Sequence, residues 1–212
     1  MNKKIIPLAL LSLIAFFPNG CTYSVPPIDS SLPQKPLIEK QPIATGIYYS
    51  DEFRSYEGIQ HISLSRYGSR YRITLGPPSV TLFDQIFSEM FAKVIQVNDL
   101  PPLLQAESDI KAVFEPQIVN FYIYTDEMTS CIQVDLIYKI TLYDLNGADI
   151  ANWPIQGSGY SVGSLKSIDH PKMVREAAQI AMRDVAAQFM LGFRRNPEAM
   201  KWLRSLGITG SY

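Results

Sequence analysis

The sequence predicts an α+β protein with a predominantly antiparallel sheet of four or five strands and two long helices packed on one face. One observation is an apolar–polar alternation over 131–145 and 149–161, interrupted by Asn146-Gly147. The other is a pair of segments, 80–94 and 174–193, in which apolar residues recur every three or four positions. Each helix then has one apolar stripe, so both are expected to cover the same face. The expected order is β-α-β-β-β-α with a short C-terminal helix.

The segment 131–161 predicts a β-hairpin. Ile132, Val134 and Leu136 begin a row of alternating apolar residues that continues to Leu142. Asn146-Gly147 is the favoured pair for a two-residue turn, in which both residues have positive φ. We therefore expect 131–145 and 149–161 to pair as antiparallel strands.

The first long helix is expected after Gly76-Pro77-Pro78, with Ser79 as its N-cap. Tyr71, Ile73 and Leu75 form a half-buried strand before it. Segment 112–124 forms a long aromatic strand after it, and Pro116 favours an edge or a bulge there. The helical stripe consists of Val80, Phe83, Phe87, Met90, Phe91 and Val94.

The second long helix is expected to begin at Asp169, as N-cap, with Pro171 in its first turn. Asn196-Pro197 starts a short third helix that Gly207 ends. The apolar face of the second helix consists of Val174, Ala178, Ala181, Val185, Phe189 and Phe193.

The first 20 residues are typical of a signal peptide. Lys3 and Lys4 precede an apolar run, Ile5–Phe17, which is too short for a membrane-spanning helix of roughly 20 residues. The Gly20-Cys21 junction resembles a bacterial lipoprotein signal, in which cleavage exposes a lipid-modified cysteine. Cys21 is therefore the expected lipid-attachment site. An ordinary secretory signal, with Cys21 a plain thiol, is the alternative.

Residues 21–43 are expected to be a proline-rich linker, and 44–212 a single periplasmic domain. Five prolines lie between Thr22 and Pro42, and proline favours an extended, semi-stiff chain. About 20 such residues could reach roughly 60 Å. The one other cysteine, Cys131, is expected to be buried and inert if Cys21 is acylated.

The composition excludes two classes of function. The chain has 19 basic and 20 acidic residues and no basic block, so it has no signature of a nucleic-acid-binding protein. Beyond the leader, no apolar run is long enough to span a membrane.

The search for chemistry predicts no catalytic, cofactor-binding or metal site. Gly159-Tyr160-Ser161-Val162-Gly163 spells a nucleophile-elbow motif, but the following acid and base, Asp169 and His170, are adjacent and cannot act as a relay. Only two histidines are present, and neither lies in a metal-ligand spacing. The pairs Asp51-Glu52 and Asp126-Glu127 are expected to be solvated turn acids.

The Gly20-Cys21 junction, the proline-rich spacer and this β/α order resemble small Gram-negative envelope lipoproteins. They are similar to the YajG-like and ABC-transport-auxiliary lipoproteins, and more distantly to the lipoprotein that plugs the lipopolysaccharide-assembly barrel. Thr22, instead of Asp, after the cysteine implies sorting to the outer membrane.

The resemblance implies a non-enzymatic accessory of a transport or assembly complex, which docks through an exposed sheet face or edge strand. A binding module for a lipid, glycan or peptidoglycan ligand, held behind Phe83, Phe87 and Phe189, is the alternative. An esterase that uses Ser161 is a third hypothesis.

Overall fold

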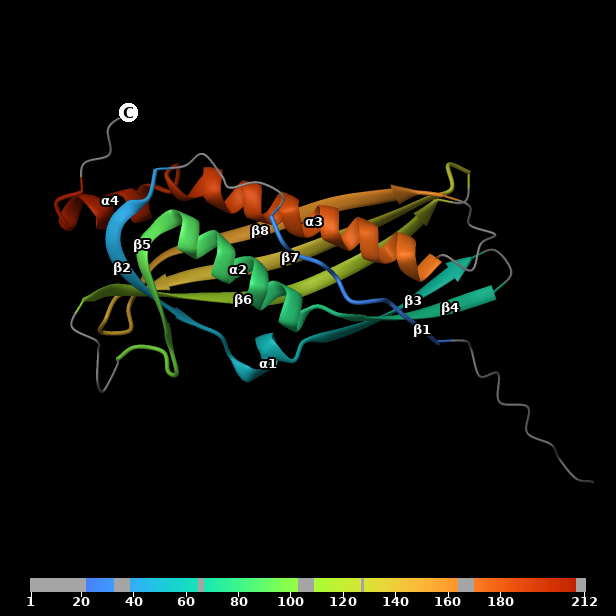
Figure 1. Cartoon of the computed structure of the whole chain (residues 1–212), viewed down its shortest axis with the longest axis horizontal. Coiled ribbons are helices and arrows are strands. Elements are labelled where there is room, and N and C mark those ends of the chain that lie inside the picture. The colour runs from blue at the N-terminus through green and yellow to red at the C-terminus, as the bar shows by residue number, and fades with distance from the viewer. Residues whose placement is uncertain are drawn as a thin grey trace, which may run out of the picture.

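The computed structural model describes residues 22–32, 39–64, 67–102, 109–126, 128–163 and 170–208. Two sheets and two long helices form an elongated body, with both helices on the same face of the larger sheet (Figure 1). The expected α+β class and the placement of the two long helices are confirmed. The expected order β-α-β-β-β-α is corrected to β-β-α-β-β-α-β-β-β-β-α-α, and a second sheet of three strands is present among the described residues. The elements are β1 Thr22–Ser24, β2 Gln41–Tyr48, α1 Asp51–Arg54, β3 Glu57–Leu64, β4 Tyr67–Thr74, α2 Gly76–Met90, β5 Phe91–Val97, β6 Ile110–Asp126, β7 Cys131–Tyr143, β8 Asp149–Val162, α3 His170–Phe193 and α4 Pro197–Ser205.

The larger sheet has the strand order β5-β2-β6-β7-β8 and is mixed. Strands β6, β7 and β8 are antiparallel neighbours, as expected, but β2 runs parallel to both β5 and β6. The expectation of a predominantly antiparallel sheet is therefore wrong for this half. The cause is the crossover through α2, which returns the chain to the sheet in the direction of β2.

The smaller sheet has the order β1-β4-β3 and lies at the end of the molecule opposite α4 (Figure 1). It contains the start of the segment that was expected to be a free linker. Thr22 pairs with Arg70 in parallel, and Val25 N donates to Arg72 O at 2.9 Å. The expectation of an extended spacer is corrected over residues 22–32, which lie against the domain.

Apolar side chains next to the prolines explain this contact. Val25, Ile28 and Leu32 pack against the core, and Ser30 is buried. The backbone N of Leu32 donates to Gln85 Oε1 on α2 at 3.0 Å. The proline-rich composition of this segment predicted a linker, although its apolar residues pack against the domain.

The hairpin of β7 and β8 has nearly the expected bounds, but its turn is different. Of Asn146 and Gly147, only Gly147 has positive φ, at 90°. Asp144 Oδ1 accepts from Asn146 N at 2.9 Å and from Ala148 N at 2.8 Å. Three residues therefore form the loop, as in a turn followed by a left-handed glycine, and the aspartate side chain holds it.

Helix α2 begins at Gly76, three residues before the expected cap. Both prolines fit its first turn, where no N–H is needed. Ser79 is therefore inside the helix, where its hydroxyl is buried and hydrogen-bonded to Tyr138 Oη at 2.7 Å. The helix ends at Met90, and Phe91, expected on the helical stripe, begins β5.

Helix α3 spans most of the expected segment, and its expected cap, Asp169, lies outside the described residues. The short C-terminal helix is confirmed, because Asn196 Oδ1 accepts from Ala199 N at 3.0 Å at the start of α4. None of the helices among the described residues combines the length and apolar composition needed to cross a bilayer.

Aromatic rings fill the space between helices and sheet. The ring centroid of Phe87 on α2 lies 4.7 Å from the ring centroid of Phe114 on β6. It lies 5.6 Å from the ring centroid of Phe189 on α3. The ring of Phe83 packs against the ring of Tyr138 on β7, with the two centroids 5.4 Å apart. All five side chains are fully buried. The layer between sheet and helices is therefore a packed core.

Candidate interaction surface

The face of the larger sheet that points away from the helices carries the exposed side chains of β6, β7 and β8. Cross-strand partners share a face, so the register defines its rows. One row is Tyr124, Gln133 and Tyr160, and the next is Tyr122, Asp135 and Ser158.

Four side chains on this face form what we call the tyrosine patch. Tyr122, Tyr124, Tyr160 and Val162 are 37%, 49%, 60% and 76% exposed. The rings of Tyr122 and Tyr124 stack with centroids 6.0 Å apart. Aromatic side chains with a polar end are enriched at protein interfaces. The patch is therefore the main candidate for contact with another molecule.

A fixed polar network lies beside the tyrosine patch. Asp135 is only 6% exposed, and both of its carboxylate oxygens are hydrogen-bonded. Gln133 Nε2 donates to Oδ1 at 2.9 Å, and Gln156 Nε2 donates to Oδ2 at 3.2 Å. A buried carboxylate that accepts two amide hydrogen bonds is compensated for lost hydration, so this part of the face is rigid.

Side chains of α3 occupy part of the free edge of β8. Ser158 N donates to Asp184 Oδ2 at 3.0 Å, and Gln188 Nε2 donates to Gln156 O at 2.8 Å. An added strand would have to displace these contacts to pair there. Of the two expected docking modes, the sheet face is thus favoured over this edge strand.

The nucleophile-elbow motif lies in a strand. Ser161 is part of β8, is 8% exposed, and its hydroxyl donates to Glu176 Oε2 at 3.0 Å. A nucleophile elbow requires a sharp turn between a strand and a helix, which Ser161 lacks. His170 Nδ1 is instead hydrogen-bonded to Tyr71 Oη at 3.2 Å, and Asp169 lies outside the described residues.

The remaining residues considered from the sequence are dispersed. Cys21 lies outside the described residues, and Cys131 is a free, partly exposed thiol at the start of β7. Asp126 accepts hydrogen bonds from Thr129 and Met128 N, which lower the pKa of its carboxyl. No three His, Cys, Asp or Glu side chains converge as a metal site among the described residues.

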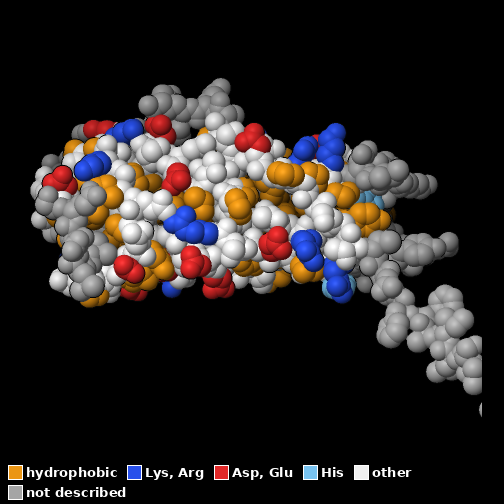
Figure 2. All heavy atoms as spheres, turned by 60° about the horizontal axis from the view of Figure 1, so that its bottom comes forward, with side chains coloured by type: hydrophobic (Ala, Val, Ile, Leu, Met, Phe, Trp, Pro, Cys, Tyr) orange, Lys and Arg blue, Asp and Glu red, His pale blue; other side chains and the backbone are white. Residues whose placement is uncertain are grey.

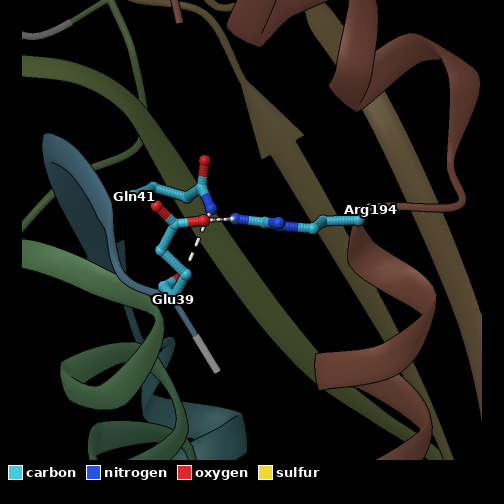
Figure 3. A network of polar contacts seen from close by, with 3 residues as sticks. All are labelled: Glu39, Gln41 and Arg194. Atoms are coloured by element: carbon cyan, nitrogen blue, oxygen red, sulfur yellow. Dashed lines mark hydrogen bonds and ion pairs between the residues drawn. The ribbon is translucent and has the colours of Figure 1, made fainter. Parts of the chain in front are cut away.

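Two open grooves were not predicted from the sequence. One, of about 240 Å³, lies near the C-terminal ends of α2 and α3, and is lined by Met90, Met190 and the ion pair of Arg194 Nη2 with Glu39 Oε2 at 3.2 Å. Figure 3 shows Gln41 beside this pair, where Gln41 Nε2 donates to Glu39 O at 3.4 Å. The ion pair joins the C-terminal end of α3 to the chain just before β2.

The second groove, of about 490 Å³, is lined by residues 25–30 together with Pro77, Pro78 and Thr81. Its wall forms only when residues 25–30 fold onto the start of α2, which explains why sequence patterns gave no signal for it. Neither groove is lined by Phe83, Phe87 or Phe189.

No family model matches the sequence, and no curated protein matches it. Solved structures give distant similarities. A Xanthomonas campestris protein of the DUF330 family shares 11% identity over 80% of this chain and 92% of its own, with a TM-score of 0.43. A candidate lipoprotein of Caulobacter crescentus shares 10% identity over 58% of this chain and 80% of its own, with a TM-score of 0.40.

A candidate homologue of a neuraminyllactose-binding hemagglutinin, from Helicobacter pylori, shares 11% identity. The match covers 82% of this chain and 96% of that chain, with a TM-score of 0.48. Because all three TM-scores are below 0.5, the function of the chain has to be argued from its own residues.

Proposed function

We propose that this protein is a non-enzymatic accessory lipoprotein of the cell envelope. A lipid on Cys21 holds it to the periplasmic face of the outer membrane, and the tyrosine patch docks it to a protein of a transport or assembly complex.

The tyrosine patch is the observation that carries the docking proposal. Hot spots of protein interfaces are enriched in tyrosine, because the ring offers a large apolar area while few rotatable bonds are immobilised. Stacking of Tyr122 on Tyr124 restricts the rotamers of both rings, so less side-chain entropy is lost when a partner binds. The buried Asp135 network keeps the strands beneath them rigid, which reduces the entropy lost on binding.

The leader supports the membrane anchor. Each buried CH₂ of an acyl chain contributes roughly 0.8 kcal/mol, and stable anchoring takes two chains or more. A diacylated or triacylated Cys21 would therefore hold the domain permanently at a leaflet. The partner is then an envelope protein that reaches the periplasmic space.

The packed core disfavours the alternative of a ligand held between helices and sheet. The site proposed for such a ligand, behind Phe83, Phe87 and Phe189, is filled by these rings and by Phe114. A lipid or glycan would then need a different site, and the two open grooves are candidates for it.

Photo-crosslinking in cells, at native expression, tests the docking surface. A photoreactive residue replaces Tyr122, Tyr124 or Tyr160 in turn, and matched probes replace Ile180 and Leu191, exposed apolar residues of α3. We expect one envelope protein to be captured from the patch positions and not from α3. Capture of that protein equally from α3, or of no protein from any patch position, would contradict the proposal.

A further inference from the structure

The outer face of the small sheet is basic at the end where the described chain begins. On this face Arg70 lies between Thr22 of β1 and His61 of β3. All three side chains are exposed. Arg70 Nε donates to His61 Nε2 at 2.9 Å, which orders the guanidinium along the sheet.

The next row contains a second cation and an apolar side chain. Ser24, Arg72 and Ile59 are cross-strand partners, and Ile59 is 51% exposed. We call His61, Arg70, Arg72 and Ile59 the basic face. In Figure 2, Lys, Arg and His side chains gather with apolar side chains at this end of the molecule.

The charge reverses further along the same strands. In the third row Glu57 pairs with Thr74, and Thr74 Oγ1 donates to Glu57 Oε1 at 3.2 Å. At about 3.3 Å per residue, Thr74 lies roughly 13 Å along β4 from Arg70. This separation exceeds the Debye length of about 8 Å at physiological ionic strength, so Glu57 does not cancel the charge of Arg70.

The polypeptide connects this basic end directly to the proposed anchor. Thr22, the neighbour of Arg70 in the sheet, follows Cys21 in the sequence, and consecutive Cα atoms are about 3.8 Å apart. A lipid on Cys21 therefore places Arg70, which lies one strand spacing of about 4.8 Å from Thr22, close to the headgroups. Because β1 runs parallel to β4, Arg72 and then Glu57 lie progressively farther from the anchor.

We propose that the basic face rests on anionic phospholipid headgroups of the leaflet that carries the anchor, and that this contact fixes the orientation of the domain. The proposal rests on the lipid at Cys21. Arginine donates paired hydrogen bonds to phosphate oxygens, and Ile59 supplies an apolar contact at the interface. The end of the molecule that carries α4 then points away from the membrane (Figure 1).

Arginine footprinting on the mature protein tests this contact. Protein purified as the producing cell processes it is reconstituted on nanodiscs of phosphatidylcholine, with or without phosphatidylglycerol. The rate of phenylglyoxal modification at each arginine is then read by mass spectrometry. Arg195 and Arg204, exposed at the opposite end, are internal controls. We expect Arg70 and Arg72, but not Arg195 and Arg204, to react several-fold more slowly on anionic discs, and 0.5 M salt to abolish the difference.

Variants separate charge from fold. A basic residue near an anionic surface contributes about a fivefold preference for the docked state, so Arg72→Gln should weaken the protection of Arg70 by about fivefold. Arg72→Lys and the distant Lys201→Gln should leave that protection in place. Equal reaction rates at Arg70 on the two kinds of disc, or a slowing shared by Arg195 and Arg204, would overturn the proposal.

The intact mass of the same sample tests the lipid anchor on Cys21 independently of the membrane contact made by the basic face. A mature chain without lipid on Cys21 contradicts the anchor. The footprint is then measured on the free protein mixed with the same discs, where protection of Arg70 supports the basic face and its absence overturns it.

Discussion

Gln60 of β3 pairs with the backbone of Ile123 of β6 through its side-chain amide. Gln60 Oε1 accepts from Ile123 N at 2.7 Å, and Gln60 Nε2 donates to Ile123 O at 3.0 Å. The amide thus satisfies both hydrogen-bonding groups of Ile123 along the edge of β6 that faces away from β7. This contact fixes the small sheet, and with it the basic face, relative to the larger sheet.

Replacing Gln60 with Ala should lower the free energy of unfolding by about 1–3 kcal/mol, because both backbone groups of Ile123 lose their partner. Chemical denaturation measures the change. Ile59→Thr, on the opposite face of the same strand, is the control and should stay within about 0.5 kcal/mol of the native protein. Equal effects of the two substitutions would show that the amide contact is not stabilising.

Gly159 allows α3 to pack directly on β8. A Cβ at this position would lie 2.2 Å from Ala177 O and 2.5 Å from Ala181 N. Gly159→Ala should therefore cost about 1–3 kcal/mol or more, since backbone has to move. At Gly192, near the C-terminal end of α3, a Cβ would meet no neighbouring element within 4 Å. Gly192→Ala should stabilise the protein by up to about 1 kcal/mol, and thermal melts should separate the two variants in opposite directions.

The buried pair of Tyr138 and Ser79 should behave as a coupled unit. Tyr138→Phe and Ser79→Ala each leave one buried hydroxyl without its partner, at a cost of about 1–3 kcal/mol. In the double variant no unpaired hydroxyl remains. Its loss of unfolding free energy should therefore be about 1 kcal/mol smaller than the sum of the losses in the two single variants. If the two losses are additive in this double-mutant cycle, the hydrogen bond between Ser79 and Tyr138 does not stabilise the fold.

Stability should fall in alkali, partly through Tyr143. Burial, followed by the hydrogen bond to Glu115, raises the pKa of Tyr143 to about 12, whereas the unfolded value is about 10. The stabilisation is complete below pH 10 and is lost as the pH rises toward 12, because the unfolded chain releases its proton first. Because Tyr143 is only partly buried and solvent screens its interactions, Tyr143→Phe should reduce the slope of unfolding free energy against pH by less than about 1.4 kcal/mol per unit in this window. The same slope in Tyr143→Phe and in the native protein would contradict a raised pKa of Tyr143.

Local patterns predicted the elements better than their arrangement. The alternation in 131–161 identified β7 and β8, and the apolar stripes located α2 and α3. The parallel pairing of β2 was not predictable in this way, because alternation describes which face is buried and not the direction of a neighbour. Phe91 illustrates the limit, since its apolar side chain suits both the end of a helical stripe and the buried start of β5.

The surfaces were only partly predictable. The alternation over 131–145 places Gln133 and Asp135 on one face of a strand, but it does not show that Tyr122 and Tyr124 stack or that Asp135 is buried. The basic face gave no signal, because its arginines become neighbours of Thr22 only through the pairing of β1 with β4. The proline-rich composition of residues 21–43 predicted a linker and gave no indication that β1 pairs with β4.

The lipid on Cys21 is tested most directly by the intact mass and N-terminal peptide of the mature protein. We expect a chain that starts at Cys21 and carries the added mass of two or three acyl chains. A mature chain that starts at Thr22 or near Ala15 without lipid would contradict the anchor and the membrane-bound accessory role that depends on it.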